Sequence, residues 1–373
     1  MLPVLCAVIV SASAARLTPV YAATEAANTP LPWATSARLE ARTTPPQTLC
    51  ALDQEDRGGP AGRSERHNVE LHGGRLSALL VDNEGSAGSG FSQLRHADFP
   101  ERSLFSWVGL NFEHVFNGVL ADDYRSGSTP RNDPCHILVH SASSASLVWP
   151  AEGSSWGLAC EMRFALSGAN CVDIDFTITP TRPDIIHHQF HPPYVAMMWA
   201  SYLELARDRS IHFYGTDGKN KGWMALGQES CGAFEQGAIS CYGVPPLPWE
   251  CNANAANLGQ HFSKKFLSPF YYGLVDGDGD PATADDTMVF IMMFDQRQPI
   301  RFAMWNFFPG ADGKADPHRP AWDWQFIVRN PRVGKTYGYK ARLVYKRFVS
   351  PQDVRHEYLH WLEEQKQDAN PRP

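Results

Sequence analysis

Residues 160–178 read CEMRFALSGANCVDIDFTI, and this stretch decides the fold. Two runs of alternating apolar and polar residues, typical of half-buried strands, flank the short Gly-Ala-Asn segment and predict a hairpin. Cross-strand partners must share a face. A two-residue turn would set Met162 beside Asp175, whereas a three-residue turn pairs Met162 with Phe176 and Arg163 with Asp175. We therefore predict the three-residue turn, with its Asn in the left-handed conformation that such loops need.

The same stretch carries a resemblance to a known family. Met-x-Phe-x-Leu, a loop with Asn, Val-x-Ile-x-Phe-x-Ile-Thr, a proline and then His and Tyr before another apolar run resemble the middle of the galactose mutarotase-like superfamily. The resemblance implies an all-β fold, a large antiparallel β-supersandwich, with a sugar-binding concave face. It makes His191 the nearest match to the histidine that mutarotases present to the sugar. The chain has no counterpart of their late Gly-Val-Gln strand and is not a close match to true aldose mutarotases.

Composition bounds the class of protein. Aromatic residues make up 12% of the 373 residues, and most lie in alternating runs, which favours β structure. The net charge is -7 with scattered Lys and Arg, so we expect no nucleic-acid partner. After the apolar N-terminus, no run reaches the roughly 18 apolar residues of a membrane span, so we expect none.

The expected organisation has four parts. Residues 1–22 resemble a signal peptide with cleavage after Ala14 or Ala22, which predicts a secreted or periplasmic protein; an intact Met1 in the mass of the native chain would contradict this. Residues 23–64 are expected to form a disordered linker. Residues 65–350 are expected to form the β-supersandwich domain, and residues 351–373 a short C-terminal helix and tail that begin after the N-cap sequence Ser-Pro-Gln-Asp.

Candidate site residues emerge first in the run from Ser106 to Phe116. Period two places Asn111 and Glu113 on one face with a tryptophan, a mixture that sugar-binding grooves use, and His114 on the opposite, apolar face. A solvated edge strand is the alternative for Glu113. A histidine among apolar neighbours is more often a core residue than a catalyst, so a core role is expected for His114, with a functional role as the alternative.

The C-terminal half adds further candidates. The run 287–295 is apolar on both faces and is expected to turn back into 300–307, which contains Trp305 and Asn306. A further hairpin is expected to join 322–328 to 336–346, placing Lys340 and Arg342 beside Asp323 on one polar face that either lines a groove or meets water.

Metals and cofactors are not expected. Three histidines at 187, 188 and 191 lack a carboxylate partner nearby, so we expect no metal there. The sequence Asp276-Gly-Asp-Gly-Asp280 departs from the EF-hand pattern at Pro281 and Thr287; an acidic turn is expected, with Ca²⁺ as the alternative.

These observations predict a carbohydrate ligand on the concave face. If the protein is an enzyme, a carboxylate and a histidine would act as general acid and base in glycoside hydrolase, polysaccharide lyase or epimerase-like chemistry. The alternatives are a non-catalytic carbohydrate-binding protein and a structural or interaction protein. The expected catalytic residues are Glu113, His191, His212 and Asp323. The expected substrate-binding residues are Asn111, Trp305, Asn306, Trp322, Trp324, Lys340 and Arg342, with the tryptophans as stacking platforms.

Overall fold

The computed structural model describes residues 67–83, 88–118, 130–227, 236–247, 263–280, 283, 285–305 and 316–369. They belong to the compact unit Pro60–Pro373. The expected signal peptide and linker lie outside the described residues and stay predictions, as do the domain boundaries.

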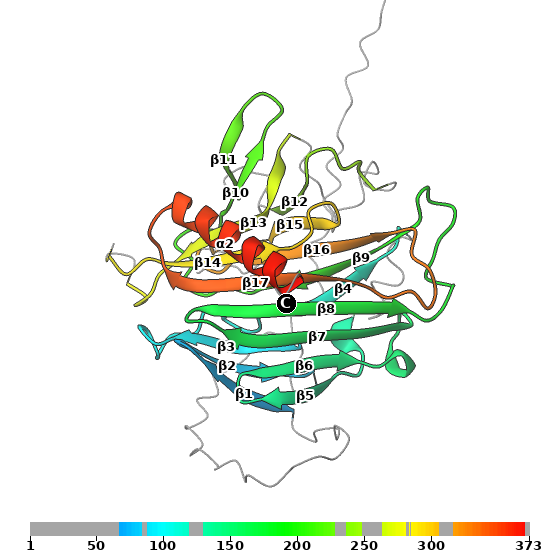
Figure 1. Cartoon of the computed structure of the whole chain (residues 1–373), viewed down its shortest axis with the longest axis horizontal. Helices are drawn as coiled ribbons and strands as arrows, with labels where there is room; N and C mark the ends of the chain where they lie inside the picture. Colours follow the sequence, from blue (N-terminus) through cyan, green and yellow to red (C-terminus); the bar gives the residue numbers. More distant parts are fainter. Residues whose placement is uncertain are drawn as a thin grey trace, which may run out of the picture. The chain divides into compact units, whose positions relative to one another are not determined.

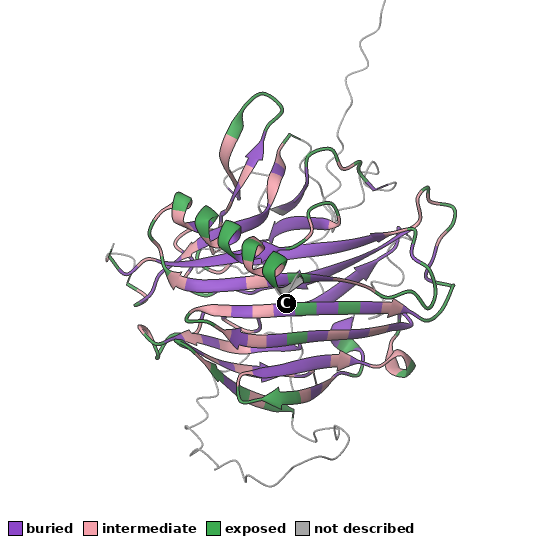
Figure 2. Cartoon of the chain, viewed as in Figure 1, coloured by how far each residue is buried: buried purple, intermediate pink, exposed green. Residues whose placement is uncertain are grey.

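The largest sheet has nine antiparallel strands (Figure 1). Their spatial order is β11 (Lys221–Leu226), β10 (Ile211–Thr216), β13 (Lys265–Val275), β14 (Met288–Phe294), β17 (Tyr337–Arg347), β8 (Cys171–Pro180), β7 (Leu158–Ser167), β6 (Ser144–Trp149) and β5 (His136–Ser141). Burial alternates along β7 and β8, as expected of strands with one solvated face (Figure 2).

Two smaller sheets complete the fold. The five-stranded sheet runs β12 (Gln236–Ser240), β15 (Ile300–Trp305), β16 (Ala321–Arg329), β9 (Tyr194–Ala200) and β4 (Asn111–Phe116). The three-stranded sheet contains β1 (Asn68–Gly73), β2 (Leu76–Val81) and β3 (Gly90–His96). The short helices are η1 (Pro130–Asn132) and η2 (Ala151–Gly153).

One apolar core joins all three sheets. It draws inward-facing side chains from each of them, as a sandwich requires. Stacked rings cross its centre: Trp199 and Trp324 lie 5.4 Å apart at an interplanar angle of 2°, and Trp199 and Phe112 lie 4.9 Å apart. The all-β antiparallel sandwich expected from the sequence is confirmed by this pairing and packing.

The predicted register of the β7–β8 hairpin is confirmed. Met162 pairs with Phe176 and Arg163 with Asp175, on either side of a three-residue turn. The left-handed residue of that turn is Gly168, with φ of 54°, and not the predicted Asn170. The Asn170 side chain instead lies 3.0 Å from His96 Nε2, which ties the turn to β3.

The two hairpins predicted in the C-terminal half are wrong. β14 pairs with β13 and β17, whereas β15 pairs with β12 and β16, so 287–295 and 300–307 belong to different sheets. β16 pairs with β15 and β9, and β17 with β14 and β8, so 322–328 does not pair with 336–346. Every residue of β14 and β15 is buried, and burial on both faces gives no signal of which strand lies alongside.

The predicted C-terminal helix is confirmed as α2 (Pro351–Ala369). The Ser350 hydroxyl accepts a hydrogen bond from the Asp353 N–H at 3.1 Å, which is the expected N-cap. Val354, Tyr358 and Trp361 pack the helix on the outer face of the nine-stranded sheet over β13, β14 and β17.

Candidate functional site

One face of the five-stranded sheet carries a cluster of buried polar side chains. On β16, side chains alternate between the core, where the tryptophans lie, and the opposite face of the sheet. On β15 and β4 too, some side chains enter the core and others lie on that opposite face. We call this set the polar face: Asn111, Glu113, Arg301, Trp305, Asp323 and Gln325. Each of the six is buried.

A β-bulge in β4 places Glu113. Phe112 pairs with Trp199 and His114 with Met198, so Glu113 and His114 oppose one residue of β9. Such a bulge inverts the alternation and re-aims a side chain. The prediction that His114 lies opposite Glu113, on the apolar face, is wrong for this reason: His114 pairs beside Met198, on the side of the polar face.

Glu113 is held by two hydrogen bonds to the same oxygen. Its Oε1 accepts from Arg131 Nη1 at 2.6 Å and from the Tyr202 hydroxyl at 2.7 Å, and its Oε2 lies 3.9 Å from His114 Nε2. Burial, and then the Glu113 charge, raise the pKa of Tyr202 well above its usual range. Burial lowers the pKa of His114 to about 4, against the opposing pull of Glu113. Glu113 therefore keeps a donor hydroxyl and a neutral imidazole beside it at neutral pH.

Asp323 is a carboxyl group of a different character. Its Oδ1 accepts the Ser201 N–H at 3.0 Å, and its Oδ2 has no hydrogen-bond partner among the described residues. Burial, and then the Glu113 charge, raise its pKa well above the usual range, and the Ser201 hydrogen bond opposes this only in part. The raised pKa favours the protonated form of Asp323, which can donate a hydrogen bond or a proton.

Two side-chain amides on the same face have atoms without a hydrogen-bond partner among the described residues. Neither Oε1 nor Nε2 of Gln325 has a hydrogen-bond partner in the described part of the chain, and neither has Nδ2 of Asn111. Gln325 lies two residues after Asp323 on β16 and so points to the same side of the sheet. Buried polar atoms are normally satisfied, so the unpartnered atoms of Asp323, Gln325 and Asn111 set this face apart from an ordinary core.

The predicted tryptophan platforms divide between the two faces. Trp305 lies on the polar face with 2% of its surface exposed. Trp322 and Trp324 lie in the core instead, because they alternate along β16 with Asp323 and Gln325, which face the other side. Their indole N–H groups are used internally, by the Arg209 carbonyl at 2.9 Å and the Tyr339 hydroxyl at 2.8 Å. Asn306 lies outside the described residues.

The other predicted residues lie elsewhere in the fold. His191 is exposed in the turn before β9. His212 is on the outer face of the nine-stranded sheet, where it stacks on Tyr272 with ring centroids 5.0 Å apart. Lys340 and Arg342 lie on that outer face too, and not beside Asp323, because β17 pairs with β14 and β8.

The structure adds residues that the sequence did not indicate. Arg131 belongs to η1 and Tyr202 follows β9, and no local pattern connects either residue with Glu113. The sequence did carry a signal for Gln325: it lies two residues from Asp323 on the same strand, and residues two apart on a strand share a face. Only the strand pairing shows that Arg301 lies opposite Gln325.

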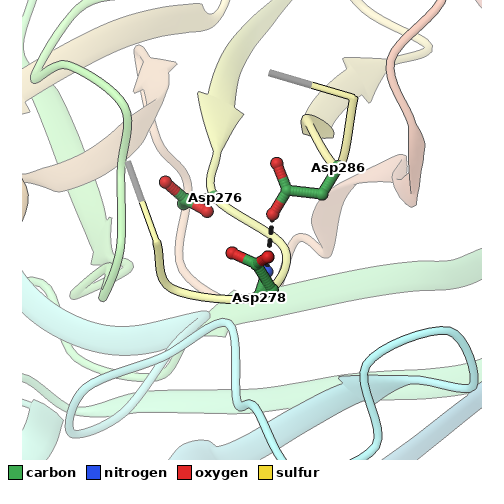
Figure 3. A group of neighbouring side chains, drawn as sticks. All are labelled: Asp276, Asp278 and Asp286. Carbon is green, nitrogen blue, oxygen red and sulfur yellow. Dashed lines mark hydrogen bonds between the residues drawn. The ribbon is translucent and has the colours of Figure 1, made fainter. Parts of the chain in front are cut away.

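A second cluster lies between β13 and β14 (Figure 3). Carboxylate oxygens of Asp276, Asp278 and Asp286 lie within 4.8 Å of one another. Asp286 accepts hydrogen bonds from the Asp278 N–H at 2.7 Å and from Arg207 Nη2 at 2.6 Å. Although burial acts against it, this bonding lowers the pKa of Asp286 to about 2. Burial, and then the neighbouring Asp286, raise the pKa of Asp276. Arg207 already offsets part of the negative charge, and Ca²⁺ at this turn stays a prediction.

Within the described part of the chain, no helix has the length and hydropathy needed to cross a bilayer. No model of a known protein family matches the chain, and no curated protein matches it.

Solved structures do match. A protein from Escherichia coli K12, described as a candidate aldose 1-epimerase, is 12% identical with a TM-score of 0.43, over 75% of this chain and 99% of that one. A 4-alpha-glucanotransferase from Thermococcus litoralis is 9% identical with a TM-score of 0.37, over 76% of this chain and 37% of that one. Both TM-scores are below 0.5, so neither match carries information on the ligand or the activity of this chain.

Proposed function

We propose that the polar face binds a carbohydrate, and that Asp323 and Glu113 carry out acid and base chemistry on it. The observation that carries the proposal is the set of unpartnered buried groups at Asp323 and Gln325. Each sugar hydroxyl both donates and accepts a hydrogen bond, so it matches an amide and a protonated carboxyl group placed side by side. Trp305 adds an aromatic surface, as sites for ring-shaped ligands commonly have.

The chemistry follows from the unequal surroundings of the two carboxyl groups. Pairs of titratable groups whose environments differ in this way are how enzymes divide acid and base roles. Asp323 is the proton donor in this proposal. Glu113 is the acceptor, with Arg131 and Tyr202 fixing its position. Glycosidic cleavage, elimination and epimerisation all need such a pair, and the sugar would be met outside the cytoplasm if residues 1–22 direct export.

A non-catalytic binding protein is the second candidate, and one observation favours it. Glu113 Oε1 is already engaged by Arg131 and by Tyr202, as a carboxylate that serves only to hold the fold would be. In that case Asp323 and Gln325 bind the sugar without changing it.

Replacing Gln325 by Met tests binding. The amide has no partner in the free protein, so we expect stability to stay the same or to rise by up to about 1–3 kcal/mol, the usual cost of an unsatisfied buried polar group. The ligand's hydroxyls would lose their partners, and affinity should fall about tenfold or more. The sugar is first identified on a glycan array, then titrated calorimetrically against both proteins, with urea unfolding alongside.

Ile327→Val is the matched control. Ile327 lies two residues further along β16 on the same face, and the change alters packing without touching a hydrogen bond. It should cost about 0.5–1.5 kcal/mol of stability and leave affinity nearly unchanged. If Gln325→Met instead loses stability while affinity stays the same, Gln325 serves the fold and not a ligand.

A further inference from the structure

A groove crosses the outer face of the nine-stranded sheet, away from the polar face. Its cavity of about 240 Å³ lies between the exposed side of β7, β8 and β17 and the last turns of α2. A second cavity of about 280 Å³ shares Asp175 and Lys340 with it and continues toward Tyr337. We call the joined cavities the outer groove. Together they suit a ligand that extends over more than one ring.

Three charged side chains cross the outer groove in register. Arg163 on β7 lies directly opposite Asp175 on β8, which in turn lies opposite Lys340 on β17. Directly opposed residues have Cβ atoms about 4.5–5.5 Å apart, close enough for ion pairs. In the part of the chain that the structure describes, none of the three is ion-paired, and all three are exposed. Arg163 Nε donates a hydrogen bond to the Ser144 hydroxyl at 3.3 Å, and Asp295, which lines the second cavity, interacts electrostatically with Lys340. The two cations are otherwise open to anionic groups of a ligand.

The neighbouring row of the sheet is occupied differently. Arg342 binds both oxygens of Asp173, at 2.6 and 3.2 Å, and also binds Glu364 of α2 at 2.6 Å. Arg342 therefore fixes the helix as the wall of the groove. Its guanidinium is thus engaged by two carboxylates of the protein, and its predicted role in substrate binding stays a prediction.

The helix contributes a buried donor to this wall. Trp361 lines the groove with 1% of its surface exposed, and its indole N–H has no hydrogen-bond partner among the described residues. Gln365 lines the groove one helical turn later. Trp361 thus closes the wall of the groove from beneath, and the half-buried Gln365 offers an uncharged polar group that a hydroxyl-bearing ligand can use.

We propose that the outer groove binds an acidic oligosaccharide, with carboxylates held by Arg163 and Lys340 and ring hydroxyls held by Asp175. Strands two apart lie about 9.5 Å from each other, so the two cations suit anionic groups that are separated rather than adjacent. Asp175 between them repels a continuous run of negative charge and accepts hydroxyls. Carboxylates separated by hydroxyl-bearing rings, as in a uronate chain, fit both conditions. The identification of the ligand as a sugar rests on the proposed function.

The experiment is a calorimetric titration with the trimer of galacturonic acid, with maltotriose as a neutral probe and polyglutamate as an acidic peptide. Arg163→Gln and Lys340→Gln should each weaken binding of the acidic trimer about fivefold, the effect of one exposed charge contact. Binding should also weaken as the salt concentration rises. Lys221→Gln, an exposed cation on β11 of the same sheet, is the matched control and should have no effect.

Three outcomes would overturn the proposal: no binding of the acidic trimer, equal affinity for maltotriose, or unchanged affinity in the Arg163→Gln Lys340→Gln double variant. Tighter binding of polyglutamate than of the trimer would show a peptide site instead. Sugar binding at the polar face is tested independently, because Gln325 belongs to the five-stranded sheet and the outer groove to the nine-stranded one. If Gln325→Met does not change the affinity for a neutral sugar, while the acidic trimer still binds through Arg163 and Lys340, the proposed function is rejected and the outer groove is not.

Discussion

Replacing Asp323 by Asn should lower turnover about 10²- to 10⁴-fold, the contribution that a positioned general acid usually makes. Asn keeps the shape of the side chain and can still accept the Ser201 N–H. It cannot deliver a proton. Because burial disfavours the charged form of Asp323 in the folded protein, an uncharged amide at this position should not lower stability. The measurement is product formation from the sugar identified on the array, with urea unfolding of both proteins.

The pH dependence separates catalysis from structure. The wild-type pH–rate profile should show an acid whose pKa lies well above that of an ordinary Asp, and this limb should be missing from the Asp323→Asn profile. A variant that turns over substrate within about threefold of wild type, a change far below the expected loss, would remove Asp323 from the mechanism. If affinity fell while no product formed with either protein, the non-catalytic binding protein would be the correct reading.

Protonation of His114 should by itself lower the free energy of unfolding by about 3 kcal/mol as the pH drops from about 6.5 to about 4. Burial keeps this imidazole neutral in the folded chain until about pH 4, whereas in the unfolded chain it takes up a proton near pH 6.5. Between these values the unfolded state binds more protons. The contribution is therefore fully present above the unfolded pKa and is lost as pH falls toward the folded one.

Comparison with His114→Gln isolates this contribution. Asp323 acts in the opposite direction: its raised pKa favours the folded state as pH falls toward the ordinary Asp range. The free energy of unfolding is measured in urea at pH 7 and pH 4.5 for both proteins. The loss on acidification should be smaller in the variant by about 2–3 kcal/mol. An equal loss in both proteins would mean that His114 is not held neutral in the fold.

Much of the local structure could be predicted from the sequence. The register of β7 and β8 follows from one requirement, that apolar partners share a face, and Met162 does pair with Phe176. The start of α2 follows from Ser350 and Pro351, because capping is a local interaction. Both depend on residues close together in the chain.

The candidate site was only partly predictable. Asp323 and Glu113 were chosen correctly as members of one face, but the proposed companions of Asp323, Lys340 and Arg342, belong to another sheet. His191, which the family resemblance indicates, is exposed in the turn before β9 and is not one of the residues of the polar face. Arg131 binds Glu113 although the two residues are 18 positions apart, and Arg131 lies in a short 3₁₀ helix that no periodic pattern in the sequence predicts.

The sequence by itself determined the β7–β8 hairpin with its alternation and the closing helix, because these depend on periodicity and on neighbours within a few residues. The tertiary structure alone decided which strands lie side by side and which side of each faces the core. A strand buried on both faces, such as β14, has no polar–apolar alternation from which its neighbouring strand could be predicted. A one-residue bulge at Glu113 reversed the side on which His114 lies, because the side-chain period of a strand is two and any insertion inverts it.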